Sequence, residues 1–147
     1  MNKETLENMF IRHAKEYDRA MNFYDLNNYY DRKVRREYYH NLFHNPNTDL
    51  IHIYNDTLYV GFLIITKIKN DIYEINEAYI KKTQRNQGFM TRELNNYIKN
   101  HHGTYRFDIL KGNTIGLKFF DKYFNHKLIK QEIDEEFDWL NAYEVIV

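Results

Sequence analysis

The stretch with the clearest chemical potential covers residues 78–91, AYIKKTQRNQGFMT. A strand-like pattern ends there, a polar loop with Lys81, Lys82 and Arg85 follows, and Gly88 opens a segment with helical spacing. The first N–H groups of a helix have no internal acceptors, and the helix dipole adds positive potential at that end. A bound anion accepts hydrogen bonds from those N–H groups, and a side chain at residue 88 would block the approach of the anion. The segment therefore predicts a phosphate-binding site, although an ordinary strand-to-helix turn with solvated lysines has the same pattern.

Residue types that are absent narrow the chemistry further. The chain contains no Cys, and Ser is absent as well. Disulfides, thiolate zinc sites and Cys or Ser nucleophiles are therefore excluded. His13, His40, His101, His102 and His126 show no metal-ligand spacing, so we expect no metal. Group transfer by this chain must use another side chain, or the acceptor must attack directly.

Two periodicities describe the elements that position this segment. Apolar residues that recur at steps of three and four predict helices at 5–21, 25–43, 89–101 and 113–124. Apolar segments bounded by turn residues predict strands at 49–54, 57–69, 72–82, 105–110, 127–133 and 139–146. The predicted order is ααβββαβαββ.

This order indicates a mixed α/β fold. The first three strands form an antiparallel meander, and the β-α-β run over 72–110 requires a right-handed crossover between two parallel strands. With 147 residues, of which 43% are hydrophobic, the chain has the size and core of one domain, 1–147.

Charge and hydropathy limit the partners. The 21 basic and 21 acidic residues cancel, which argues against nucleic-acid binding through bulk charge. The basic run 32–36 is interpreted as a solvated helix face, with an RNA or ribosome contact as the alternative. The longest apolar run, 60–65, is far too short to span a bilayer, and the polar start is unlike a signal peptide, so we expect a cytoplasmic protein without a membrane partner.

Residues 80–88 resemble the acyl-CoA motif of the GNAT family of N-acetyltransferases, V-x-P-x-x-[QR]-x-x-G-x-[GA]. Arg85 takes the Q/R position and Gly88 the first glycine position, whereas Lys82 replaces the common Pro and Met90 replaces the second small residue. The segment GFMTREL at 88–94 is similar to the GYMTEAL version of the ribosomal-protein acetyltransferase branch.

A second segment and the element order extend the resemblance over nearly the whole chain. Residues 113–122 resemble the pattern N-x-x-A-x-x-[FL]-Y-E-K, with Asn113 matching, Gly116 in place of Ala and Phe120 where Tyr is common. The paired helices, the meander, the strand and helix of the CoA motif and the final strand pair follow the order of the GNAT fold.

The resemblance implies that acetyl-CoA binds, as cosubstrate, between two splayed parallel strands, 72–82 and 105–110. The pantetheine arm would pair with backbone groups of Ala78, Tyr79 and Ile80. The pyrophosphate would contact backbone N–H groups of Arg85, Asn86, Gln87, Gly88, Phe89, Met90 and Thr91. Asn113 and Phe120 would line the other side of the arm.

The implied reaction is direct attack of an amine on the thioester, which needs no enzyme nucleophile. Glu74 is the candidate general base, acting through water, because the histone-acetylating branch uses a glutamate at this distance before the Q/R position. Regular strand alternation would place Glu74 on one face with Asn76, Ala78 and Ile80, and Glu77, the reserve base, on the other. A strand carboxylate paired with a lysine is the alternative for Glu74.

The group that protonates the departing sulfur is less defined. Phe120 has no hydroxyl, so Tyr123, one turn along, is the candidate acid, with a core position as the alternative.

We therefore expect an N-acetyltransferase whose acceptor is an amine-bearing small molecule or protein, with a homodimer left open. The alternative is a catalytically inactive GNAT-fold interaction module or inhibitor, with or without bound CoA. Phe120 and Met90 keep that alternative open.

Overall fold

The computed structural model describes residues 7–15, 32–133 and 140–147. The chain divides into two compact units, Met1–Thr48 and Asp49–Val147. The single domain expected from the length therefore remains a prediction. None of the helices in the described part of the chain combines the length and apolar character needed to cross a membrane.

The N-terminal unit contains a helical segment at 7–15 and the helix α2, Arg32–His44. Phe10 and Ala14 lie one turn apart and are buried, and the Phe10 ring meets the buried Tyr39 ring edge-on at 5.3 Å. The predicted first helix is confirmed for residues 7–15, and the predicted second helix for residues 32–43. The remaining parts of both predictions lie outside the described residues.

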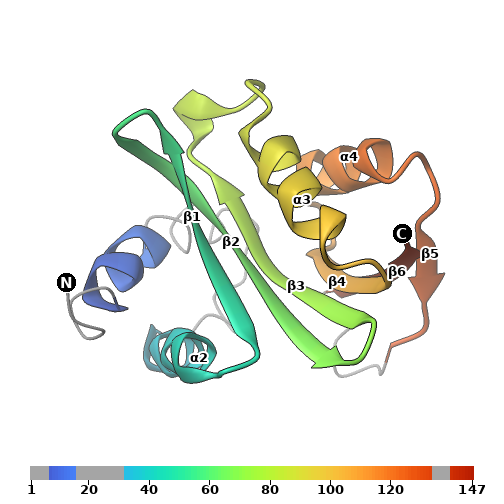
Figure 1. The fold of residues 1–147 in the computed structure, drawn as a ribbon, viewed down its shortest axis with the longest axis horizontal. Coiled ribbons are helices and arrows are strands. Elements are labelled where there is room, and N and C mark those ends of the chain that lie inside the picture. Colours follow the sequence, from blue (N-terminus) through green and yellow to red (C-terminus); the bar gives the residue numbers. More distant parts are fainter. Residues whose placement is uncertain (1–6, 16–31, 134–139) are drawn as a thin grey trace. The chain divides into compact units, whose positions relative to one another are not determined.

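The second unit is built on a six-stranded mixed sheet in the order β1-β2-β3-β4-β6-β5 (Figure 1). Its strands are β1 (Thr48–Asn55), β2 (Leu58–Lys69), β3 (Ile72–Ile80), β4 (Thr104–Leu110), β5 (Ile129–Gln131) and β6 (Leu140–Ile146). The predicted strand 72–82 ends at Ile80, because residues 82–84 form a 3-10 turn, η2. The predicted strand 127–133 shortens to 129–131.

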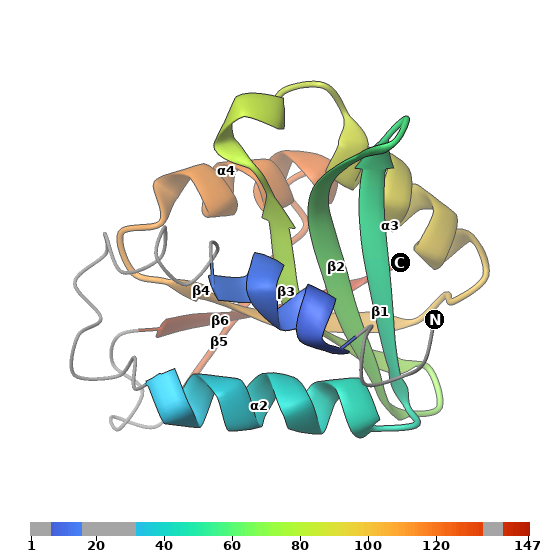
Figure 2. The same ribbon diagram turned by 90° about the vertical axis from the view of Figure 1, so that its left-hand side faces the viewer.

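Two helices, α3 (Phe89–Lys99) and α4 (Thr114–Tyr123), pack on one face of this sheet (Figure 2). Leu94 of α3 is fully buried in the core there, among apolar side chains of β2, β3 and β4. Burial of one leucine side chain contributes about 1.5–3 kcal/mol, so this face fixes the position of α3. β3 and β4 are parallel, as the crossover through α3 predicts.

A β-bulge interrupts β3 at Asn76. The register pairs Ile64 with Glu77 and the next residue, Ile65, with Ile75, so Asn76 has no partner on β2. The Asn76 side chain instead accepts a hydrogen bond from Thr66, with 2.7 Å between Oγ1 and Oδ1. An extra residue in one strand reverses the face on which the following side chains lie.

The bulge overturns the alternation expected for β3. Ile75, before the bulge, and Ala78, after it, both face the helices α3 and α4. Glu77 pairs with Ile64, whose two neighbours on β2 point into the helix-covered core, so Glu77 lies on the opposite face. Glu74 lies on that same opposite face. The prediction that Glu74 shares a face with Ala78 and that Glu77 points the other way is therefore wrong.

Candidate active site

The parallel strands β3 and β4 separate shortly after they begin. They pair at only three positions, and the last of these joins Glu74 to Arg106. Just before the separation, the rings of Tyr73 and Tyr105 stack with centroids 5.0 Å apart. Beyond it, the facing backbone edges of both strands need another partner, from water or from a ligand. The splayed strands expected from the sequence are confirmed.

The edge of β3 that faces the gap can pair with an extended ligand. The Lys81 N–H donates to the Val60 carbonyl of β2 at 2.8 Å. In an antiparallel ladder, residues that bond to the neighbouring strand alternate with residues whose backbone groups point away from it. The backbone of Tyr79 therefore also bonds to β2, while the backbone groups of Ala78 and Ile80 point to the gap. Of the three residues expected to pair with the pantetheine arm, Ala78 and Ile80 therefore keep backbone groups toward it and Tyr79 does not.

The loop that follows β3 leaves an open helix start. Gly88 has φ +81°, a left-handed conformation that favours glycine, and no described atom lies within 4 Å of a Cβ built there. Among the described side chains, none caps α3, whose first internal bond runs from the Arg92 N–H to the Gly88 carbonyl. The N–H groups of residues 89–91 therefore have no acceptor within the helix. This arrangement fits a pyrophosphate.

The side chains of Met90 and Arg85, two residues of the motif, contact other parts of the same unit. Met90, which departs from the small residue of the motif, is buried in the core, so only its backbone faces the loop. The Arg85 Nε donates to the Ile80 carbonyl at 2.9 Å, and its guanidinium lies 6.0 Å from the Tyr79 ring. Arg85 thus holds the loop against the end of β3 as an exposed cation.

Asn113 and Phe120 both contact neighbouring residues of their own unit. Asn113 caps α4 by accepting the Gly116 N–H at 3.0 Å. A Cβ on Gly116 would lie only 2.7 Å from Asn113 Nδ2, so the glycine leaves room for this position of the Asn113 side chain. Phe120 stacks on Phe107 of β4, with ring centroids 4.6 Å apart. Their contact with a cofactor stays a prediction.

Tyr123 has a structural contact that its sequence position did not indicate. Its hydroxyl donates to Asn95 Oδ1 of α3 at 2.8 Å, and its ring stacks on that of Phe119. Burial raises the pKa of Tyr123, so the hydroxyl keeps its proton at neutral pH. The bond ties α4 to α3.

We expect Tyr123→Phe to lower the free energy of unfolding by about 0.5–1.5 kcal/mol, the net contribution of one such hydrogen bond. Asn95→Ala should cost a similar amount, and the double variant little more, in a double-mutant cycle of urea unfolding. A fall in kcat of more than about tenfold, without loss of stability, would instead assign the acid role to Tyr123.

On the face of the sheet opposite α3 and α4, charged residues line a hollow of about 390 Å³. Its lining includes Glu74, Asp108 and the ion pair of Arg106 with Glu144, whose Nε and Oε2 lie 3.0 Å apart. Burial raises the pKa of Glu74, the Asp108 charge raises it further, and Arg106 partly offsets both. Burial also raises the pKa of Asp108. A raised pKa makes an ionised carboxylate a stronger base.

Asp108, Arg106 and Glu144 were not among the site residues expected from the sequence. The signal was present in β4, where the apolar residues Tyr105 and Phe107 alternate with charged residues. Alternation places one charged row on a single face. The alternation in β4 did not indicate on which face of the sheet the hollow lies.

Comparison with solved structures decides the fold. The chain superposes on an acetyltransferase from Thermus thermophilus with a TM-score of 0.63 at 12% identity, covering 76% of this chain and 72% of that one. A GNAT family acetyltransferase from Elizabethkingia anophelis with acetyl-CoA bound gives 0.59 at 12% identity, covering 80% and 84%. The chain has the GNAT fold.

A third neighbour with the GNAT fold is PaiA N-acetyltransferase from Thermoplasma acidophilum in complex with coenzyme A, with a TM-score of 0.59 at 14% identity, covering 83% of each chain. No protein-family model matches the sequence, and no curated protein sequence matches it. The expectation of a GNAT-like fold, a mixed sheet with splayed parallel strands, is confirmed.

Proposed function

We propose that this protein is an acetyl-CoA-dependent N-acetyltransferase that transfers the acetyl group directly to an amine. The observation that carries the proposal is the separation of β3 and β4 after Glu74, followed along the chain by the uncapped start of α3. Two structures with the same fold were solved with coenzyme A or acetyl-CoA bound, which supports this choice of cosubstrate.

In this proposal, acetyl-CoA is held by backbone groups of β3, by the start of α3 and by two residues at α4. Ala78 and Ile80 offer backbone groups to an extended arm, as an added strand would use them. The free N–H groups of residues 89–91 and the open space above Gly88 suit a pyrophosphate. Asn113 and Phe120 would lie on the far side of the arm. Acetyl-CoA supplies an activated thioester, so the chain needs no nucleophile of its own.

We assign the acceptor to the hollow that contains Glu74. Glu74 is also the last β3 residue paired with β4, so its carboxyl group lies at the point where the gap opens. An amine is protonated at neutral pH and must lose a proton before it attacks. Glu74 takes this proton through water, and the raised pKa brings its basicity closer to the working pH. Glu77, the reserve base, lies on the same face but is almost fully buried.

The direct test follows CoA thiol release from acetyl-CoA in the presence of a panel of primary amines and amine-bearing peptides. We expect release that depends on an amine and on Glu74. A negative panel together with a clear acetyl-CoA melting shift would favour the alternative, a non-catalytic GNAT-fold module that binds CoA. Absence of both signals would refute the cofactor assignment itself.

A hydroxyl added at residue 120 should speed the reaction. Phe120 occupies the position where the GNAT pattern commonly has Tyr, and water or Tyr123 must otherwise protonate the departing sulfur. We expect Phe120→Tyr to raise kcat by about tenfold, or ~1.4 kcal/mol of barrier, with little change in acetyl-CoA affinity. Phe119→Tyr, on the neighbouring ring of α4, is the matched control and should leave kcat unchanged. No acceleration would mean that protonation of the sulfur does not limit turnover.

A further inference from the structure

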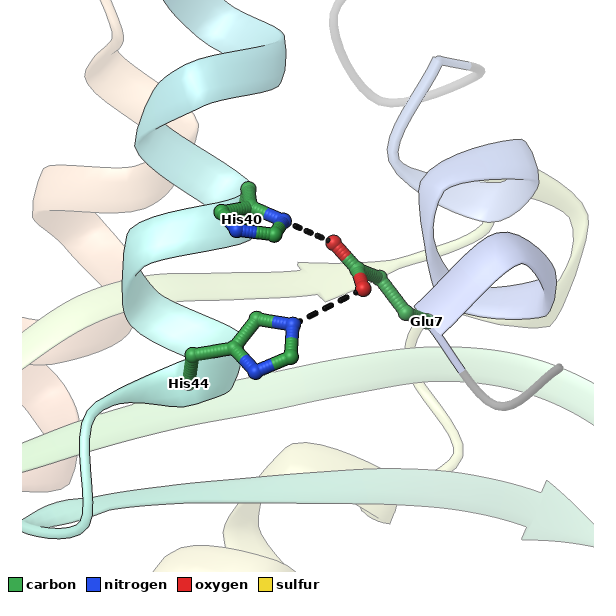
Figure 3. Close-up of side chains that lie close together, drawn as sticks. All are labelled: Glu7, His40 and His44. Carbon is green, nitrogen blue, oxygen red and sulfur yellow. Dashed lines mark hydrogen bonds and ion pairs between the residues drawn. The ribbon is translucent and has the colours of Figure 1, made fainter. Parts of the chain in front are cut away.

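The N-terminal unit contains a cluster of three polar side chains that the proposed transfer reaction does not use. Glu7 of the helical segment 7–15 faces His40 and His44 of α2 (Figure 3). His40 Nδ1 lies 2.5 Å from Glu7 Oε1, and His44 Nε2 lies 2.9 Å from Glu7 Oε2. One nitrogen of each ring and one carboxylate oxygen lie within 4.8 Å of one another.

The spacing of the two histidines suits joint coordination. Residues four apart on a helix lie on the same face, and the ring centroids of His40 and His44 are 4.3 Å apart. Two histidines at this spacing form half of a common zinc site on a helix. The spacing of His40 and His44 is visible in the sequence, but the carboxylate comes from a position 33 residues before His40, so the sequence does not show that the three side chains meet.

We propose that Glu7, His40 and His44 bind a divalent transition-metal ion of the zinc type. Two imidazoles and one carboxylate are a donor set typical of zinc sites that keep a position open. The cluster borders a hollow of about 420 Å³, which leaves room for water as a fourth ligand. Within the described residues, no other group of three such side chains comes together.

The surroundings favour a cation. The Glu7 side chain is 13% exposed, whereas those of His40 and His44 are 56% and 38% exposed, so the carboxylate lies at the floor and the rings at the rim. Glu37 and Arg36 line the same hollow and cancel in charge. With neutral histidines, the Glu7 carboxylate leaves a net charge of −1 beside two imidazole lone pairs.

Binding of such an ion would also join two parts of the chain. The helical segment 7–15 and α2 would be linked through the metal as well as through the contact of Phe10 with Tyr39. Because an ion that binds only the folded state stabilises it by mass action, melting temperature should rise with metal concentration. The competing interpretation is a pair of His–carboxylate hydrogen bonds that needs no metal.

The test titrates the metal-free protein with Zn²⁺ and with Co²⁺, and with Mg²⁺ as a cation that prefers oxygen ligands. We expect one Zn²⁺ or Co²⁺ per chain, visible Co²⁺ absorption, a higher melting temperature, and no effect of Mg²⁺. The variants His40→Ala, His44→Ala and Glu7→Gln should each weaken Zn²⁺ affinity by more than about tenfold, since even supporting residues around metals cost that much.

His126 is a matched control. Its Nδ1 also contacts a carboxylate, Asp121 Oδ2, but among the described residues it belongs to no group of three possible metal ligands. His126→Ala should leave Zn²⁺ affinity unchanged. Circular dichroism verifies that the variants fold, and ring-proton NMR shifts on Zn²⁺ addition report the ligands in the unaltered chain. Absence of one-to-one Zn²⁺ binding, or equal affinity after removal of both His40 and His44, would overturn the proposal. These readouts do not involve acetyl-CoA, so either proposal can fail alone.

Discussion

Replacing Gly88 by Glu is expected to abolish acetyl-CoA binding. The substitution puts a negative charge into the open space above the N-terminus of α3, where no described atom now lies within 4 Å of a Cβ. An anion would then meet a carboxylate instead of free N–H groups. For the unaltered chain, acetyl-CoA at ~100 times its Kd should stabilise the fold by about 2.7 kcal/mol, which thermal melting detects.

Backbone strain must be separated from loss of the site. Gly112 is the matched control, because it also has a left-handed φ, +90°, with no described atom within 4 Å of a built Cβ. Gly88→Ala and Gly112→Ala should cost similar stability, about 1–2 kcal/mol. Only the substitutions at residue 88 should reduce the acetyl-CoA melting shift. An equal shift in Gly88→Glu and in the unaltered chain would contradict the proposed pyrophosphate site.

Replacing Glu74 by Gln is the second change with a large expected effect. Glutamine keeps the size of the side chain but cannot accept the proton of the amine, so kcat should fall by ~10²–10⁴-fold. Acetyl-CoA affinity should stay nearly the same, because the Glu74 carboxyl lies on the opposite face from the helix α3. Steady-state kinetics with a melting assay separate the two effects. Glu132→Gln, at an exposed carboxylate, is the control.

The pH dependence of kcat provides a sharper test of the same group. The rate should fall as the pH drops through the pKa of Glu74, because only the ionised carboxylate is a base. Asp108→Asn removes a charge that raises this pKa, so the acidic limb should move to lower pH. Arg106→Gln removes a charge that lowers the pKa, so the limb should move to higher pH. Shifts in the same direction would mean that Glu74 is not the titrating base.

If Glu77→Gln stops turnover and Glu74→Gln does not, the base is Glu77. The bulge at Asn76 makes this outcome worth testing, since both carboxylates lie on one face of β3.

Much of the fold could be predicted from the sequence because its signals are local. The polar loop at 81–88 and the glycine at its end indicated a strand-loop-helix unit, and the structure places Gly88 at the N-terminus of α3. Helical and strand-like periodicity located α3, α4 and the strands to within a few residues. Such patterns depend on the order of neighbouring side chains, which the sequence contains in full.

The candidate site depended on the register between strands. Asn76 is an extra residue in β3 with no partner on β2, and this single insertion decides the faces of Glu74 and Glu77. Neither the residues beside Asn76 nor the composition of β3 indicates the bulge, since the same alternating sequence is compatible with a regular strand and with a bulged one.

The sequence by itself determined the order of the elements, the candidate phosphate-binding loop and the GNAT-like resemblance. Only the tertiary structure decided which charged groups surround Glu74, that the Tyr123 hydroxyl bonds to Asn95, and that Glu7 meets two histidines of α2. The physical reason is separation along the chain. Periodicity reports which face a side chain occupies, whereas a contact between residues 28 or 33 positions apart exists only after the chain has folded.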